Sequence, residues 1–522
     1  MGRNILFITT DQQRYDALGC NGGTVARTPA VDGLAADGVR FERAYAQNTV
    51  CKPARSTMLT GQYVRTHGVV ANGIPLPNDA PSVAETLAGN GYRTALIGKA
   101  HFEPIHDPEL RWAENRMAAE GSTGPYRGIE HAEFANHGPW GASHYAHWVR
   151  ENHREFRSGF ANIFDITPGG ETGAPEVALN PVPRGVYHTD WVADRVTDWL
   201  DSLDSDDDWF CWMSFPDPHH PWDPPDSERG RVDWRDLDLP VGHPGSDERI
   251  REILATKPAH WLAWYEGSMP NVDAAPGNFV PAELTHDRLR EILAKIHIEN
   301  ELIDDGCARV LRRITERGWD ADTDVIFTTD HGELQGDFGL LYKGPFHVDA
   351  LMRLPMVWRP APSAGVAPAV VGDPVGQLDL APTFCEIAGV EVPEWMQGTP
   401  LPTSPDATRE RALCEWDSQL DTGYHLRTIV RDGWVCTVYE PSTPETGLAA
   451  ADLLAVYGVD DVTRVLYDGT EGELYNLDED PRQWVNRWDD DSCARLRSDL
   501  VAELYESLPA PRDPPLEVES MA

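Results

Sequence analysis

The stretch NTVCKPARSTMLTGQY, residues 48–63, places Cys51 close to two basic residues, Lys52 and Arg55. Basic groups are scarce in this chain, which has 44 lysines and arginines against 85 aspartates and glutamates. A cysteine that only fills a core needs no charged neighbours, whereas a reactive one does. Pro53 suits the first turn of a helix, where its missing N–H costs no hydrogen bond. The pattern therefore predicts a nucleophilic cysteine at the start of a helix.

A helix that begins at Cys51 would favour a bound anion at that point, because its first amides are free and its dipole is positive there. Arg55 lies about one turn further on and can direct a planar guanidinium at a tetrahedral oxyanion. We therefore expect Cys51 and Arg55 to face an anionic substrate.

Polar side chains also follow four apolar runs that read as strands. Because ligands bind beyond the carboxyl ends of the strands in an open parallel sheet, these residues are expected to meet at one edge. The residues that follow the four runs are Asp11 and Gln12, Lys99 and His101, His219 and His220, and Asp330 and His331.

The two aspartates of this set predict a metal site. Asp11, Asp330 and their neighbours supply mainly oxygen ligands, which suit a hard divalent cation. Ca²⁺ is favoured, with Mg²⁺ or Mn²⁺ as alternatives, and His331 is either a ligand or a group that orients one. A tetrahedral thiolate site is not indicated.

The elements that must position these residues alternate along the chain. Apolar runs on both faces predict buried strands, and periodic stretches with a capping serine or a final glycine predict helices. The predicted strands are 4–10, 93–98, 209–215 and 324–329, and the predicted helices are 82–92, 187–203 and 284–318. The expected fold class is α/β, with a large, mostly parallel sheet flanked by helices on both faces.

The pattern changes beyond about residue 400. Strand candidates at 426–440 and 472–481 predict a smaller antiparallel subdomain, which gives a catalytic domain over 1–400 and a C-terminal α+β subdomain over 401–522. The segments 104–186 and 217–283 are too long for simple connections, and we expect them to wall the substrate pocket. Asn72 is read either as a turn residue or as a pocket amide.

Composition limits the classes of partner. The formal net charge of −41 makes nucleic acid an improbable ligand, because a polyanion would be repelled. No apolar run approaches the roughly 20 residues of a membrane span, and no export signal is evident at the N-terminus, so a cytoplasmic protein is expected.

The eight cysteines show no metal-type or disulfide-type spacing. An acidic chain with very few lysines suits high salt, and we infer a halophilic source as a hypothesis.

A bare thiolate is a poor nucleophile toward a sulfate or phosphate ester, and here the stretch CKPARSTMLTG is informative. It resembles the signature of type I sulfatases, which are formylglycine-dependent members of the alkaline phosphatase superfamily. The resemblance implies that a formylglycine-generating enzyme oxidises Cys51 to formylglycine. Its hydrate would attack the sulfur of a sulfate monoester with one hydroxyl, and the second hydroxyl would later expel sulfate.

The resemblance extends over most of the chain. GKAHF, DPHHPW and TTDHGELQGDFGLLYKG resemble further sulfatase elements, and GELYNLDEDPRQWVN resembles the closing element of the C-terminal subdomain. By this resemblance the metal ligands are Asp11, Gln12, Cys51, Asp330 and His331, and the catalytic residues are Cys51, Arg55, Lys99, His101, His219 and Lys343. Gln12 stands where the family often has a second aspartate, which makes the site less negative.

Two alternatives accompany this interpretation. Phosphonate monoester and phosphodiester hydrolases resemble the chain in Asp11-Gln12 and Asp330-His331, but they generally lack the lysine and histidine of GKAH. A non-catalytic homologue would keep the fold with an unconverted Cys51. The pair His144 and His147 has no third ligand nearby in the sequence and is read as pocket lining or surface.

Overall fold

The computed structural model describes residues 2–105, 107, 109–161, 169–269, 275–276, 279–405, 409–418, 424–442 and 465–520. Its centre is an eight-stranded sheet in which every neighbouring pair is parallel except the two pairs made by β9. In spatial order the strands are β10 (Ala369–Val371), β2 (Val39–Phe41), β9 (Met356–Arg359), β7 (Thr323–Thr329), β1 (Asn4–Thr10), β6 (Trp209–Ser214), β4 (Arg93–Gly98) and β5 (His131–Phe134).

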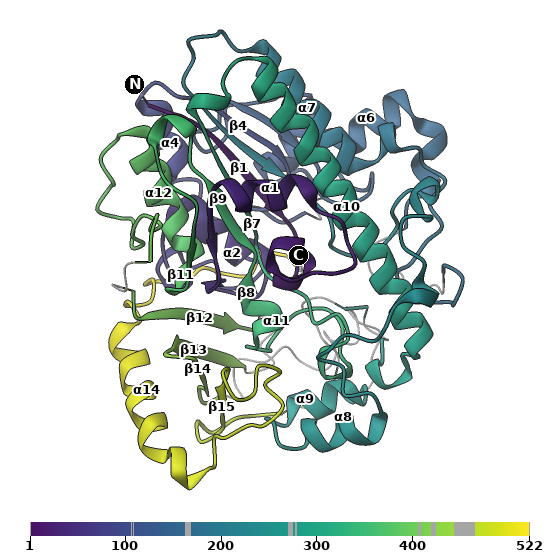
Figure 1. Ribbon diagram of the computed structural model, residues 1–522, viewed down its shortest axis with the longest axis vertical. Helices are drawn as coiled ribbons and strands as arrows, with labels where there is room; N and C mark the ends of the chain where they lie inside the picture. The colour runs from purple at the N-terminus through teal and green to yellow at the C-terminus, as the bar shows by residue number, and fades with distance from the viewer. Residues whose placement is uncertain are drawn as a thin grey trace.

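Helices cover both faces of this sheet (Figure 1). One face carries α2 (Cys51–Thr60), α4 (Val83–Gly89), α5 (Ala113–Glu120) and α12 (Leu380–Ala388). The other carries α1 (Pro29–Asp37), α6 (His144–Asn152), α7 (His188–Ser202) and α10 (His286–Glu316). The predicted α/β fold class is confirmed.

Strand β1 shows why two apolar faces form. Ile5 and Phe7 pack into the core on the side of α4 and α12, while Leu6 and Ile8 pack into the core on the side of α7 and α10. Because successive side chains of a strand point to opposite faces, a continuous apolar run is needed when both faces are covered. The four predicted strands match β1, β4, β6 and β7 in the structure.

A three-stranded sheet and a four-stranded antiparallel sheet complete the described β-structure. The former contains β11 (Val375–Gly376), β3 (Ala44–Tyr45) and β8 (Arg353–Leu354), and the latter β12 (Arg411–Asp417), β13 (His425–Arg431), β14 (Trp434–Tyr439) and β15 (Gly472–Asn476). Helix α14 (Ala494–Ser507) packs on the four-stranded sheet, at the end of the molecule remote from α7 (Figure 1). The predicted antiparallel unit is confirmed, while the domain boundary at residue 400 stays a prediction.

The predicted strand candidate 426–440 is in fact two strands joined by a tight turn. Asp432 and Gly433 connect β13 to β14, and both have positive φ angles, of 49° and 77°. An Asp-Gly pair is well suited to such a turn, because glycine adopts this conformation without strain.

The two long segments contain helices of their own. Segment 104–186 includes β5, α5 and α6, and segment 217–283 includes α8 (Asp247–Leu254) and α9 (His260–Tyr265). Shorter helices are α3 (Val64–His67) and α11 (Asp349–Met352). None of the helices in the described ranges has the length and hydropathy that a membrane span requires.

Candidate active site

Helix α2 begins at Cys51, as the sequence predicted. Pro53 occupies the third position of the helix, where no intrahelical partner is needed for its nitrogen. Oδ1 of Asn72 accepts a hydrogen bond of 3.0 Å from the backbone N–H of Lys52, so a neighbouring loop caps the first turn. Asn72 itself lies in a turn, in which the backbone N–H of Ile74 donates to the carbonyl oxygen of Ala71 at 3.2 Å, so of its two readings the structure supports the turn residue. The helix ends at Gly61, whose φ of 65° suits glycine.

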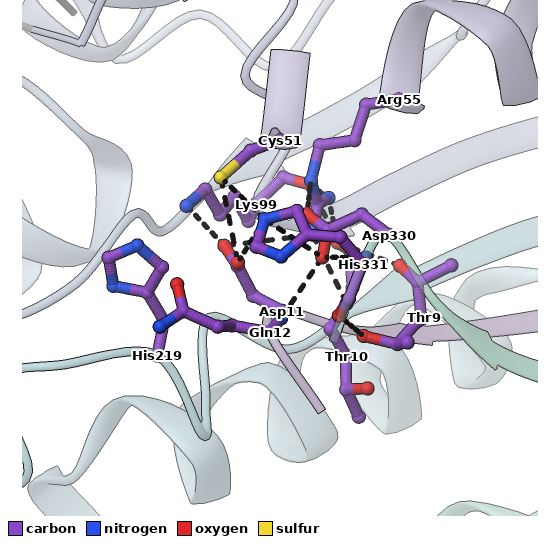
Figure 2. A network of polar contacts seen from close by, with 12 residues as sticks. Thr9, Thr10, Asp11, Gln12, Cys51, Arg55, Lys99, His219, Asp330 and His331 are labelled. Carbon is purple, nitrogen blue, oxygen red and sulfur yellow. Dashed lines mark hydrogen bonds and ion pairs between the residues drawn. The ribbon is translucent and has the colours of Figure 1, made fainter. Parts of the chain in front are cut away.

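The carboxyl ends of β1 and β7 bring the two predicted aspartates together. Thr10 pairs with Thr329 in a parallel register, so Asp11 and Asp330 leave the sheet side by side. Ligand atoms of Asp11, Cys51, Asp330 and His331 all lie within 4.8 Å of one another, and all four residues are buried. Figure 2 shows these side chains converging on one point above the strand ends. The predicted convergence is therefore present.

Arg55 contacts the carboxylates rather than an open anion site. Its Nε donates to Oδ2 of Asp330 at 2.8 Å, and its Nη1 donates to the backbone oxygen of Lys99 at 2.7 Å and to Oγ of Ser214 at 2.8 Å. Nη2 lies 3.9 Å from Oδ2 of Asp11. We expected Arg55 to direct its guanidinium at a substrate oxyanion. In the structure the guanidinium contacts both aspartates, and its role toward a substrate stays a prediction.

Two lysines place their ammonium groups in the site. Lys99 forms an ion pair with Oδ2 of Asp11. Nζ of Lys343 lies 3.0 Å from Sγ of Cys51, 2.7 Å from Oε1 of Gln12 and 2.9 Å from Nε2 of His219. Burial alone would raise the pKa of Asp11, but Lys99 and the other cations hold that pKa well below its usual value. Asp11 is therefore an ionised carboxylate, as a metal ligand must be.

The same charges act on Cys51. Burial and the Asp11 carboxylate each raise the pKa of its thiol, whereas Lys343 and Lys99 lower it, and the net pKa is below the usual value. Position 51 is thus a site where negative charge on a side chain is stabilised.

His331 directs its Nε2 at the cluster. Its Nδ1 lies 2.9 Å from the carbonyl oxygen of Gly332, which can only accept, so Nδ1 carries the proton. Its Nε2 lies 3.2 Å from Sγ of Cys51 and 3.7 Å from Oδ1 of Asp330. A backbone partner that fixes the tautomer in this way is typical of a metal-binding histidine.

His101 and His219 are both neutral. Burial and then the cations of Lys99 and Lys52 put the pKa of His101 well below its usual value, and burial and Lys343 do the same for His219. Neither ring nitrogen of His101 has a hydrogen-bond partner among the described residues. Nδ1 of His219 donates to the carbonyl oxygen of His220 at 2.5 Å, so its Nε2 accepts from Lys343. Nδ1 of His220 lies 2.9 Å from Oε2 of Glu176, so His219 remains the candidate catalytic histidine of the pair.

The comparisons with known proteins agree on one family. The family model described as Sulfatase matches residues 3–390 of the chain. The chain belongs to the sulfatase family. It is therefore a sulfuric ester hydrolase by descent, and the resemblance found in the sequence is confirmed.

Related proteins cover nearly the whole chain. The uncharacterized sulfatase YidJ of Escherichia coli is 25% identical over 98% of this chain and 88% of its own length. An arylsulfatase of Clostridium perfringens is 27% identical over 77% of this chain and 78% of its own length. Among solved structures, the phosphonate monoester hydrolase of Agrobacterium radiobacter superposes with a TM-score of 0.72 at 23% identity, covering 97% of this chain and 95% of that one.

Two residues of this sulfatase site were missed by the sequence reasoning. Glu333 accepts from Nε2 of Gln12 and, at 3.1 Å, from the backbone N–H of Gln335. Because Nε2 of Gln12 faces Glu333, its Oε1 faces Lys343 and the site. Glu333 follows Asp330-His331 in the stretch DHGE, so its position in the sequence could have indicated it. The second, His137, lies in the long segment 104–186, where no pattern distinguished it.

All five lysines of this sulfatase are buried, with at most 7% of any of them exposed. Lys99 and Lys343 lie in the site. Lys257 is enclosed by aromatic rings, 4.5 Å from the centroid of Trp261. Burial lowers the pKa of Lys52 to about 7, and its Nζ has no hydrogen-bond partner within the described ranges. Lysine is therefore scarce in this chain because none of its five lysines lies on the surface.

The pair His144 and His147 lies outside the site. Nδ1 of His144 accepts from the backbone N–H of Phe134 at 3.0 Å, and its Nε2 lies 2.9 Å from the carbonyl oxygen of Ser122. His147 pairs with Glu151 at 2.9 Å on the exposed side of α6. His144 therefore supports the backbone, and His147 is a surface residue.

Proposed function

We propose that this sulfatase hydrolyses O- or N-linked sulfate monoesters through a formylglycine derived from Cys51. The observation that carries the proposal is the position of Cys51. It lies at the N-terminus of α2, within 3.0 Å of the Lys343 ammonium and inside the cluster of Asp11, Asp330 and His331. Formylglycine supplies, as its hydrate, two hydroxyls on one carbon, of which one is the nucleophile and the other permits product release.

A divalent cation fits the cluster. Asp11 and Asp330 offer carboxylate oxygens, His331 offers Nε2, position 51 offers its side chain, and Oε1 of Gln12 faces the same space. This oxygen-rich set suits Ca²⁺, with Mg²⁺ or Mn²⁺ as alternatives. When bound, such a cation supplies positive charge that polarises the oxygens around it.

The chain's own residues have distinct tasks in the reaction. Lys99 and Lys343 neutralise the sulfuryl oxygens as negative charge spreads over them in the transition state. Lys343 carries a proton that can pass to the leaving oxygen, whereas His219 is neutral and accepts from Lys343. His101 is a neutral base that takes the proton whose removal releases sulfate.

Maturation requires a partner. We propose that a formylglycine-generating enzyme converts Cys51, and that this happens in the cytoplasm, where the protein would act on small sulfate esters. Cell fractionation checks the location. Mass spectrometry of the peptide that contains position 51, from the native host, checks the conversion: the aldehyde mass is expected, and an intact thiol would identify a non-catalytic homologue.

Hydrolysis of an aryl sulfate by purified, converted protein tests the activity. Release of sulfate is expected, and a Cys51→Ala variant, which cannot be converted, should lose it. A converted protein that turns over no sulfate monoester from an aryl, sugar and choline panel would overturn the proposal.

One observation favours a second candidate. Gln12 replaces an aspartate, so the site carries one negative charge fewer, as in phosphonate monoester and phosphodiester hydrolases. Lys99 and His101 favour the sulfatase reading. Side-by-side turnover of an aryl sulfate and an aryl phosphonate ester by the same preparation decides between them, and a preference of about a thousandfold for the phosphonate, roughly 4 kcal/mol in transition-state binding, would reverse our choice.

A further inference from the structure

His137 comes to the active site from the edge of the sheet. Strand β5 pairs in parallel with β4, with Gly98 opposite Phe134, so the chain beyond β5 leaves at the same edge as Lys99. A backbone hydrogen bond of 3.0 Å from Ala135 to Gly98 continues this pairing. His137 is 8% exposed, so it is buried beside the site.

The ring of His137 contacts the ammonium of Lys99. Its Nε2 lies 3.2 Å from Nζ of Lys99. Because an ammonium only donates, Nε2 holds a lone pair and the proton of the neutral ring is on Nδ1. Burial, and next Lys99, lower the pKa of His137 well below its usual value, in agreement with a neutral ring. Lys99 is thus held between Asp11 on one side and His137 on the other.

The same ring packs against His219. The centroids of the two imidazoles are 4.3 Å apart and their planes are tilted by 33°. Nε2 of His219 accepts from Lys343 in the same way that Nε2 of His137 accepts from Lys99. Each ammonium is therefore held by one ring of a contacting pair.

We propose that His137 is a positioning residue. Together with His219 it sets the spacing of the Lys99 and Lys343 ammonium groups, so that both can contact one tetrahedral anion. This inference rests on the proposed function, since the anion is the sulfuryl group of the substrate. Two like charges repel each other, and each is also drawn toward Asp11. Two neutral acceptor rings packed against each other hold the two ammonium groups in fixed directions without adding charge.

Two substitutions separate the functions of the ring. His137→Phe keeps a flat ring against His219 but removes the acceptor for Lys99. His137→Gln keeps an acceptor but removes the ring. We expect His137→Phe to lower kcat/KM for an aryl sulfate by about 10- to 100-fold, the usual effect of losing a group that orients a catalytic side chain, at an unchanged melting temperature. His137→Gln should recover a large part of this loss, and the surface variant His147→Gln should behave as wild type.

A purely structural role predicts another result. If both His137 variants lose activity together with thermal stability, or if His137→Phe keeps wild-type kcat/KM, the inference is overturned.

Binding of inorganic sulfate distinguishes a failure of this inference from a failure of the proposed function. Calorimetry needs no turnover, and His137→Phe should bind sulfate about tenfold more weakly than wild type, or about 1.4 kcal/mol. If wild type hydrolyses no sulfate ester but this difference holds, only the proposed function fails. Equal sulfate binding by wild type and His137→Phe overturns the inference alone, and no sulfate binding by wild type overturns both.

Discussion

Nζ of Lys343 lies 3.0 Å from Sγ of Cys51, at the N-terminus of α2. Lys343 follows Cys51 by 292 residues in the chain, yet its ammonium hydrogen-bonds the sulfur of the candidate nucleophile. Burial lowers the pKa of Lys343, but the charges of Cys51 and Asp11 outweigh this and raise it, so the group is a cation. In the mechanism that we propose, this contact marks where negative charge is stabilised during the reaction.

Replacing Lys343 by methionine should remove this stabilisation while keeping the length of the side chain. We expect kcat for an aryl sulfate to fall by about 10²- to 10³-fold, the cost of losing one donor to a developing oxyanion. Steady-state kinetics measure it, with Lys343→Arg as the control that keeps the charge. A Lys343→Met variant with near wild-type kcat would contradict the assignment.

Removal of the proposed cation should lower both the stability of the fold and the catalytic activity. Asp11 and Asp330 are buried next to each other, and a cation held at about 100 times its dissociation constant contributes about 2.7 kcal/mol to the free energy of unfolding. The melting temperature should fall with a chelator and recover with Ca²⁺, Mg²⁺ or Mn²⁺ added separately. Asp330→Asn should respond less. An identical melting temperature with and without chelator would speak against a metal at this site.

Stability should depend on pH through His67. Burial lowers the pKa of His67 to about 3, whereas an unfolded histidine has a pKa of about 6.5. Between these values the unfolded state binds more protons, so the contribution of His67 is complete above about pH 6.5 and is lost as the pH falls toward 3. It amounts to about 1.4 kcal/mol per pH unit in that window.

The variant His67→Gln tests this contribution. Glutamine can keep the contact of 3.1 Å to Thr57 and the acceptor for the backbone N–H of Val69. Denaturant unfolding from about pH 7 to about pH 5 should show a shallower loss of stability in the variant than in wild type. Parallel pH curves for the two proteins would refute the assignment.

The buried lysines predict resistance to amine reagents. Each of the five side chains is at most 7% exposed, so an acylating reagent should leave all five unmodified in the native protein and modify them once a denaturant is added. Peptide mass spectrometry measures this. If Lys257 or Lys295 of the native protein were acylated as fast as an exposed lysine, the fold would have to open readily.

Salt should stabilise the protein. The net charge is −41, and the surface carries arginine as its only strong cation, so acidic groups repel one another at low ionic strength. The screening length falls from about 10 Å at 0.1 M salt to about 3 Å at 1 M. The melting temperature should therefore rise over this range, as our proposal of a halophilic source requires. A melting temperature that does not change with salt concentration would contradict the proposal.

The buried strands of the sheet could be predicted because they are buried on both faces. Residues 4–10 and 209–215 are mainly apolar runs, and a strand that is covered on both faces needs such a run. Strands β2 and β9 have only 3 and 4 residues, and no comparable run marks them. The antiparallel pairing of β2 with β9 joins segments about 320 residues apart in the chain, and β9 is also antiparallel to its other neighbour, β7.

The sequence by itself identified the family of this sulfatase and the candidate residues of its site: the signature around Cys51, the aspartates that end two strands, and the lysines at 99 and 343. Those assignments depend on residue type and on local spacing, which a single chain displays. Only the tertiary structure decided which group each side chain faces. It placed the guanidinium of Arg55 against Asp330, directed Oε1 of Gln12 at Lys343, and placed His137 against Lys99. These contacts join elements that are remote in the chain, and packing of the whole sheet sets them.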